Sequence, residues 1–214
     1  MRTYDLESTL LTDFNRLMPD FFGKTKHILK SELTVGNSTA DLVALTYSKV
    51  NWPVQIASLS IKECVLLSIL RRQGSLCLDE LAAMSGENVR SLIVGPLSRI
   101  EEWGLVRRCR DGRMALSNGK RKTYRIISFE AKLTKWKQAL RQAINYKRFS
   151  NKSYVVLPES SGHNAYRNRM VFEESGIGLV TMTDSGIKQL VPPKEHNDHD
   201  WRREYVFSRI IGSD

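Results

Sequence analysis

The stretch that decides the fold runs from Tyr124 to Leu157 and reads YRIISFEAKLTKWKQALRQAINYKRFSNKSYVVL. It opens with Arg125–Phe129, rich in β-branched and aromatic residues, and closes with a second apolar run, Ser153–Leu157; both are typical of buried strands. Between them, from Thr134 to Phe149, apolar side chains recur at helical spacing. A strand, a helix and a strand of this length predict a βαβ unit of a mainly parallel sheet, where functional groups collect at the strand ends.

An acid and a lysine close the first of these strands. Glu130 and Lys132 are two positions apart, so the alternation of side chains along a strand places them on the same face. On the helix that follows, Gln142 and Tyr146 are four positions apart and therefore lie one above the other. We expect a polar site where the first strand ends, with this helix beside it.

The combination of E-x-K at a strand end with Q-x-x-x-Y on the next helix resembles the PD-(D/E)xK nuclease superfamily, in its RecB-like branch. The resemblance implies an α/β fold with a restriction-endonuclease-like mixed sheet flanked by helices. It also requires an aspartate at the start of the preceding strand. Asp41 supplies one, because it leads into an apolar run that ends at Leu45, although Ala40 stands where the family has proline.

The resemblance further implies a Mg²⁺-dependent deoxyribonuclease that hydrolyses phosphodiester bonds, with Mn²⁺ as a substitute metal. Asp41, Glu130 and the carbonyl of Ala131 would bind the metal, since Mg²⁺ prefers hard oxygen ligands. Lys132 would orient the attacking water and offset developing charge. The catalytic residues that the resemblance implies are Asp41, Glu130, Lys132, Gln142 and Tyr146. E-x-K alone is common, and an ordinary ion pair at the strand ends is the alternative interpretation.

The 89 positions between Asp41 and Glu130 are several times what a hairpin between their strands would use, which predicts an inserted domain. Within the gap, helices are expected over Ile61–Gln73, Leu78–Met84 and Asn88–Trp103, and a hairpin with a two-residue Asp111-Gly112 turn over 105–116. This order resembles a winged helix-turn-helix. We therefore expect a discontinuous nuclease-like core, residues 1–58 and 123–214, and a winged helix-turn-helix insertion, residues 59–122.

Positive charge in the predicted insertion gathers in the hairpin and in the segment that leaves it, where Asp111 is the single acid. Such a surface attracts phosphates, and the third helix offers side chains that could reach base edges. The residues expected to contact DNA are Arg90, Arg99, Arg107, Arg108, Arg110, Arg113, Lys120, Arg121 and Lys122. Winged helices also bind proteins, and a run of charge is often only a solvated face, so protein docking stays as the alternative.

The N-terminal part of the chain predicts a helix over Leu6–Leu17 and then a β-hairpin, Lys26–Val35 with Thr39–Tyr47. Glu7, in the first turn of the helix, is a candidate auxiliary acid, because many members of the resembled family add an acid from this helix. The alternative is a solvated acid that the helix N-terminus favours. Glu32, in the hairpin, is a second candidate of equal standing.

The C-terminal part is expected to complete the sheet with a helix over His163–Glu174 and a strand over Gly178–Met182. The tail that follows contains His196 and His199, three positions apart. Their spacing suggests either a pair of metal ligands or a solvated loop.

Composition restricts the class of protein. The chain has 214 residues, 41% of them hydrophobic, and a net charge of +10, so it can bury one large core or two small ones, and its surface favours a polyanion. No apolar run approaches the roughly 20 residues that cross a bilayer, and we expect a cytoplasmic protein without a membrane partner. The three cysteines lack metal-ligand spacing, which predicts free thiols.

DNA is the expected partner of this protein. The competing hypothesis is a non-catalytic DNA-binding regulator that uses a nuclease fold as a scaffold, because a fold alone does not fix function. The complete set of two acids and a lysine argues against that hypothesis. A homodimer, or one subunit of a larger defence or recombination complex, is also open.

Overall fold

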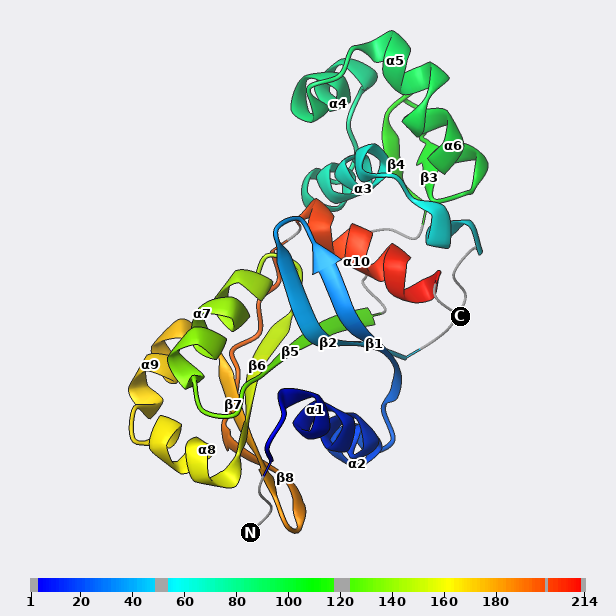
Figure 1. The fold of residues 1–214 in the computed structure, drawn as a ribbon. Helices are drawn as coiled ribbons and strands as arrows, with labels where there is room; N and C mark the ends of the chain where they lie inside the picture. The colour runs from blue at the N-terminus through cyan, green and yellow to red at the C-terminus, as the bar shows by residue number, and fades with distance from the viewer. Residues whose placement is uncertain (1–3, 49–53, 118–123, 199, 213–214) are drawn as a thin grey trace. The chain divides into compact units, whose positions relative to one another are not determined.

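The computed structural model describes residues 4–48, 54–117, 124–198 and 200–212. The chain divides into two compact units, whose elements are labelled in Figure 1. The sheet unit comprises Met1–Ser48 and Tyr124–Asn197, and the helical unit comprises Lys49–Thr123 and Asp198–Asp214. No helix in the described part of the chain is long and apolar enough to cross a membrane.

The elements of the sheet unit are, in chain order, α1 (Glu7–Arg16), α2 (Met18–Phe22), β1 (Lys26–Val35), β2 (Ser38–Tyr47), β5 (Tyr124–Ala131), α7 (Trp136–Tyr146), β6 (Lys152–Pro158), α8 (Glu159–Tyr166), α9 (Arg169–Ser175), β7 (Gly178–Thr183) and β8 (Gly186–Val191). The strands form one mixed sheet in the order β1-β2-β5-β6-β7-β8. β5, β6 and β7 are parallel, and the other neighbours are antiparallel. The predicted α/β class, hairpin and βαβ unit are confirmed.

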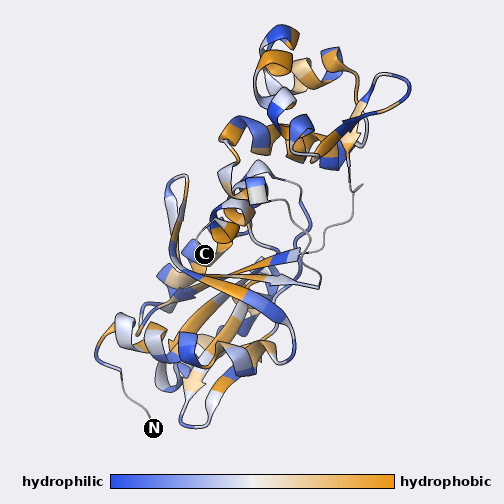
Figure 2. Ribbon diagram, turned by 90° about the vertical axis from the view of Figure 1, so that its right-hand side faces the viewer, coloured by the Kyte–Doolittle hydropathy of each residue, from blue (hydrophilic) through white to orange (hydrophobic). Residues whose placement is uncertain are grey.

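Helices cover both faces of this sheet (Figure 1). On one face, Leu10 and Phe14 of α1 pack in a cluster that includes Phe129 of β5. On the other, α7, α8 and α9 form a second cluster, in which Leu140 of α7 is buried with Val155 of β6. A strand covered on both faces needs apolar side chains in both directions, which is why the central strands are mostly orange in Figure 2.

The ladder between β2 and β5 stops just before the predicted site. Its last pair is Leu42 with Phe129, and the next step of the register places Asp41 opposite Glu130. Residues directly opposite each other in antiparallel strands share a face, so these two acids point to the same side. In the register of β1, Glu32 lies opposite Asp41, and it is the one non-glycine residue of the described chain with a positive φ, 53°.

The elements of the helical unit are η1 (Val54–Ser58), α3 (Ile61–Gln73), α4 (Leu78–Ser85), α5 (Val89–Val94), α6 (Pro96–Glu102), β3 (Val106–Arg108), β4 (Met114–Leu116) and α10 (Trp201–Ile211). β3 and β4 form a two-stranded antiparallel sheet. α10 packs against α3 and η1, and Arg71 of α3 pairs with Glu204 of α10 at 2.7 Å. Compactness thus groups 198–214 with the helical unit, whereas the sequence assigned 123–214 as a whole to the core.

The third helix predicted for this unit, over 88–103, is broken in two. α5 ends at Val94 and α6 begins at Pro96, because proline has no N–H for the helical ladder and its ring clashes with the preceding turn. Gly95 lies at the break, where an added Cβ would be 2.9 Å from the carbonyl oxygen of Ser91. The residues that the sequence placed on one helix therefore lie on two.

The predicted two-residue turn of the hairpin is also wrong. The Cys109 N–H donates to the carbonyl of Arg113 at 2.7 Å, so the loop consists of the three residues Arg110, Asp111 and Gly112. Gly112 has a φ of 81°, the left-handed conformation that a three-residue hairpin loop needs at its last position.

Candidate active site

The candidate site begins where β5 and β2 separate. At this point the N–H of Ala131 donates to Oδ2 of Asp41 at 2.8 Å, so a side-chain carboxylate satisfies it. The N–H of Lys132 instead donates to the carbonyl of Val156 on the other neighbouring strand, at 3.1 Å. The end of β5 is therefore fixed from both sides, with Glu130 held next to the two anchored residues.

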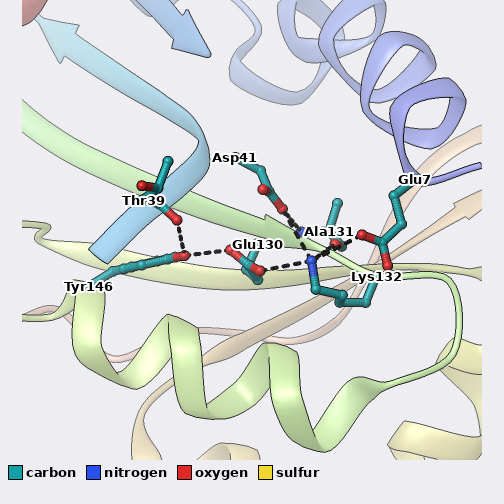
Figure 3. Close-up of polar contacts among 7 residues, drawn as sticks. All are labelled: Glu7, Thr39, Asp41, Glu130, Ala131, Lys132 and Tyr146. Carbon is teal, nitrogen blue, oxygen red and sulfur yellow. Dashed lines mark hydrogen bonds and ion pairs between the residues drawn. The ribbon is translucent and has the colours of Figure 1, made fainter. Parts of the chain in front are cut away.

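The ammonium of Lys132 lies at the centre of a group of oxygens (Figure 3). It donates to the carbonyl of Ala131 at 3.0 Å and to Oε2 of Glu7 at 3.1 Å. It also lies 3.1 Å from Oε1 of Glu130 and 4.0 Å from Oδ2 of Asp41. The structure thus brings together three acids and the lysine that the sequence singled out, including Glu7, the candidate auxiliary acid from α1.

Tyr146 fixes the other oxygen of Glu130. Its hydroxyl lies 2.5 Å from Oε2 of Glu130 and 2.6 Å from the carbonyl oxygen of Thr39, and the side chain is buried (Figure 3). A phenol carries one proton, so it donates to one of these oxygens at a time. The last residue of α7 therefore connects the strand that carries Asp41 with the strand that carries Glu130.

Burial determines the charge of this cluster. It raises the pKa of both Asp41 and Glu130 above their ordinary values, because an ionised carboxylate loses hydration there. Burial alone would lower the pKa of Lys132, but the carboxylates of Glu130, Asp41 and Glu7 together outweigh it and raise that pKa. Burial, followed by the Glu130 carboxylate, also raises the pKa of Tyr146. The cluster therefore holds a firmly charged ammonium among acids that favour keeping a proton.

Three buried serines, which our sequence analysis did not single out, connect the end of α7, where Tyr146 lies, to β5 and β6. The hydroxyl oxygen of Ser128 lies 3.0 Å from that of Ser150 and 2.9 Å from that of Ser153, and its single proton donates to one of them at a time. Ser150 in turn donates to the backbone carbonyl of Tyr146 at 2.8 Å. They tie the end of α7 to β5 and β6. The available signal was a small polar residue inside each apolar run, at Ser128 and at Ser153.

Gln142 is not joined to this cluster by any hydrogen bond among the described residues. It lies one turn before Tyr146 on α7, as the spacing predicts. Its Oε1 atom is shielded from solvent and accepts no hydrogen bond in the described part of the structure. The role that the resemblance gives to Gln142 therefore stays a prediction.

The oxygens of the cluster suit a hard divalent cation. Asp41, Glu130 and the Ala131 carbonyl already surround one positive charge, the Lys132 ammonium, and Mg²⁺ and Mn²⁺ prefer such ligands. Oε1 of Glu130 is shielded from solvent and lies 3.1 Å from the Lys132 ammonium, so a metal ion would compete with that ammonium for it. As they are placed, no three or more His, Cys, Asp or Glu among the described residues are arranged so that they could hold a metal ion, so the acids around Lys132 would have to move to bind Mg²⁺. The donor chemistry fits the predicted metal.

The predicted DNA-binding arginines lie in the helical unit, and they differ in whether their side chains contact other residues of that unit. Arg90, Arg107, Arg108 and Arg110 are exposed. Arg99 pairs with the buried Glu63 at 3.2 Å and stacks over Trp103, while Arg113 donates to Glu80 and to the carbonyl of Ser75. These last two arginines are occupied in holding the unit together. Lys120, Arg121, Lys122 and His199 lie outside the described residues.

No protein-family model matches this chain, and neither a curated protein nor a solved structure is found that matches it.

Proposed function

We propose that this protein is a metal-dependent DNA endonuclease, with a sheet unit of the restriction-endonuclease-like type. One observation carries the proposal: the ammonium of Lys132 lies within 3.0 to 4.0 Å of oxygens from Asp41, Glu130, Ala131 and Glu7. Several acids around one lysine, with the Glu130 carboxylate buried and held by the Tyr146 hydroxyl, are typical of a functional site. Cleavage of a phosphodiester is the chemistry that this combination of acids and lysine suits best.

Each group has a distinct part in this reaction. Asp41, Glu130 and the carbonyl of Ala131 would hold Mg²⁺ or Mn²⁺, which supplies an acidified water and screens the phosphate oxygens when bound. Lys132 orients that water and offsets the charge that develops on the phosphate. Tyr146 holds the carboxylate of Glu130 in position through its hydroxyl. Glu7, 3.1 Å from the ammonium, holds Lys132 from the opposite side.

We further propose that the helical unit is a winged helix-turn-helix that binds DNA. Its order of helices followed by a two-stranded hairpin supports this assignment. The hairpin carries Arg107, Arg108 and Arg110 on its surface, where their charge is available to phosphates. The break between α5 and α6 limits base recognition by one continuous helix, so binding of the DNA backbone by the hairpin is the main expected interaction.

The decisive test is cleavage by the purified protein of linear, supercoiled and branched DNA with Mg²⁺, Mn²⁺, Ca²⁺ or EDTA. We expect cleavage with Mg²⁺ or Mn²⁺ and none with Ca²⁺ alone, which coordinates more loosely and activates water poorly. Lys132→Ala should lower the rate at least about 100-fold while DNA binding persists. Lys188→Ala, which removes an exposed charge from β8, is the matched control and should cleave normally. Failure to cleave any substrate with any metal would favour the DNA-binding regulator.

A further inference from the structure

A second polar feature of the sheet unit lies at the start of α7, just past the candidate site. A pocket of about 330 Å³ opens there, lined by Thr134, Lys135, Trp136, Lys137, Gln138 and Arg141. Three of these six side chains are cationic, and one is a half-buried tryptophan that packs against Phe172. The amine of Lys137 lies over the Trp136 ring, 5.6 Å from its centre. The pocket therefore has a positive rim and an aromatic wall.

The positive charge of this pocket is not neutralised by the described chain. Lys135, Lys137 and Arg141 are exposed, and none of them makes an ion pair with a described residue. The sequence contains no acid between Glu130 and Glu159, so acids from the pocket's own segment are absent as well. α7 begins without a side-chain cap, and its dipole adds positive potential at the same end. All three charged side chains that line the pocket would therefore attract an anion.

The pocket begins two residues after Lys132 in the chain. Only Leu133 separates Lys132 from the first lining residue, Thr134, and the carbonyl of Leu133 accepts a 2.5 Å hydrogen bond from Ser161 of α8. A chain advances at most about 3.6 Å per residue, so the backbone of Lys135 lies within about 11 Å of that of Lys132. One strand of duplex DNA carries a phosphate about every 3.4 Å along its axis. The backbone where the pocket begins is therefore within a span of about three nucleotides from the backbone of Lys132.

We propose that this pocket binds a phosphate of the DNA strand that enters the candidate active site. The inference rests on the proposed function and extends it, because it places the DNA strand over the start of α7. Lys135, Lys137 and Arg141 hold the phosphate, and Trp136 gives a flat wall against which a neighbouring sugar or unpaired base packs. The ligand is a phosphodiester within the strand or a phosphate monoester at its end, and these two sources share the same chemistry.

The test compares two triple variants that remove the same charge from the same unit. The pocket variant is Lys135→Ala with Lys137→Ala and Arg141→Ala, and the control variant is Lys24→Ala with Lys26→Ala and Lys188→Ala. All six side chains are exposed, and circular dichroism verifies that both variants fold. Binding of fluorescein-labelled single-stranded and duplex DNA is measured by anisotropy with Ca²⁺, so that cleavage does not deplete the probe.

We expect the pocket variant to lose at least about tenfold in affinity near 100 mM salt, and the slope of log affinity against log salt to fall by about 0.7 to 0.9 per phosphate released. The control variant should lose under about threefold. Probes with a 5′-phosphate, a 3′-phosphate or hydroxyl ends separate the two sources: a loss confined to one phosphorylated end identifies a terminal phosphate, and an equal loss for all probes identifies an internal one. Equal losses for the two triple variants would overturn the pocket and leave only a diffuse positive surface.

A second measurement does not depend on substitution. Lys135 and Lys137 of the wild-type protein should react more slowly with an acetylating reagent when DNA is present, whereas Lys24 and Lys26 should react at an unchanged rate, as mass spectrometry of digested protein would show. Unprotected pocket lysines at saturating DNA would reject the inference even if the protein cleaves DNA. Conversely, protection and weakened binding without any cleavage would leave the pocket in place and reject the endonuclease.

Discussion

The two compact units bury charge in different ways. In the helical unit, Arg71 and Glu204 form a pair in which one guanidinium donates to both carboxylate oxygens, at 2.7 and 3.4 Å. In the sheet unit, the single ammonium of Lys132 faces the carboxylates of Glu7, Asp41 and Glu130. In the first arrangement one guanidinium contacts both oxygens of one carboxylate. In the second, one ammonium faces three carboxylates, so negatively charged groups outnumber positively charged ones.

This difference fits a structural role for the Arg71–Glu204 pair and, under the proposed function, a catalytic role for the acids around Lys132. A matched buried pair contributes little net stability relative to apolar residues, but it is costly to break, so it serves mainly to hold α3 and α10 in register. Burying carboxylates is unfavourable for folding because they lose hydration, and burial is the main reason that the pKa values of Asp41 and Glu130 are raised. A chain retains such an arrangement where a bound cation or a reaction offsets it.

The largest effect on stability should come from breaking the matched pair. Glu204→Ala leaves the guanidinium of Arg71 buried without this carboxylate, because the side chains of the pair are only 5% and 12% exposed. We expect the free energy of unfolding of the helical unit to fall by about 3–5 kcal/mol. Urea unfolding followed by circular dichroism and tryptophan fluorescence measures this change.

Two further variants make that measurement specific. Glu101→Ala removes a partly exposed partner of Arg108, at 3.8 Å, from the same unit and should change the unfolding free energy by less than about 1 kcal/mol. Arg71→Met combined with Glu204→Leu replaces both charges and should recover most of the stability. If the double variant were as unstable as Glu204→Ala, packing rather than charge would explain the effect.

Much of the sheet unit could be predicted from sequence because its signals are local. The apolar runs and helical spacing of 124–157 predicted β5, α7 and β6 to within three residues at each end. In the helical unit, a local signal of the same kind predicted α3, Ile61–Gln73, at both ends. E-x-K and Q-x-x-x-Y predicted the face on which Glu130 and Lys132 meet and the place of Tyr146. Each of these inferences depends on residues that are neighbours along the chain.

The errors arose where one residue or a distant interaction decides the structure. Pro96 breaks a helix whose apolar spacing is otherwise continuous. The sequence analysis also predicted neither β8 nor α10, both of which lie after Asp184. The predicted helix over 163–174 is likewise divided into α8 and α9. β8 is stabilised by pairing with β7 and α10 by burial against α3, so their own sequences carry weak signals. The choice between Glu7 and Glu32 as the acid beside Lys132 also required the three-dimensional structure.

A second, smaller effect tests whether the surface charge of the helical unit acts outward. The hairpin exposes the side chains of Arg107, Arg108 and Arg110 to solvent. The Arg71–Glu204 pair and the Lys132–Glu130 pair are, in contrast, largely shielded from it. Replacing all three by alanine should reduce the slope of log affinity for duplex DNA against log salt by up to about 2.7, or about 0.9 for each phosphate that is no longer neutralised. Titration at several salt concentrations, with Lys62→Ala as a same-unit control, measures it. An unchanged affinity at every salt concentration would instead indicate that this hairpin docks a protein.

The smallest effect should be the pH dependence that the burial of Asp41 and Glu130 imposes on stability. A pKa that is raised in the folded state means that the folded protein keeps a proton which the unfolded chain has released. Asp41 and Glu130 therefore stabilise the fold most below their ordinary pKa values of 3.8 and 4.5, and that contribution is lost as the pH rises through their folded pKa values. Asp41→Asn combined with Glu130→Gln abolishes both titrations, so wild type should lose stability relative to this variant as the pH rises above these ordinary values, as urea unfolding would show. Glu80→Gln is the control of opposite sign: hydrogen bonds from the backbone and side chain of Cys77 lower the pKa of Glu80, so its contribution is lost as the pH falls. A difference in stability between wild type and the double variant that stays constant as the pH rises would show that the pKa values of Asp41 and Glu130 are not raised in the folded protein.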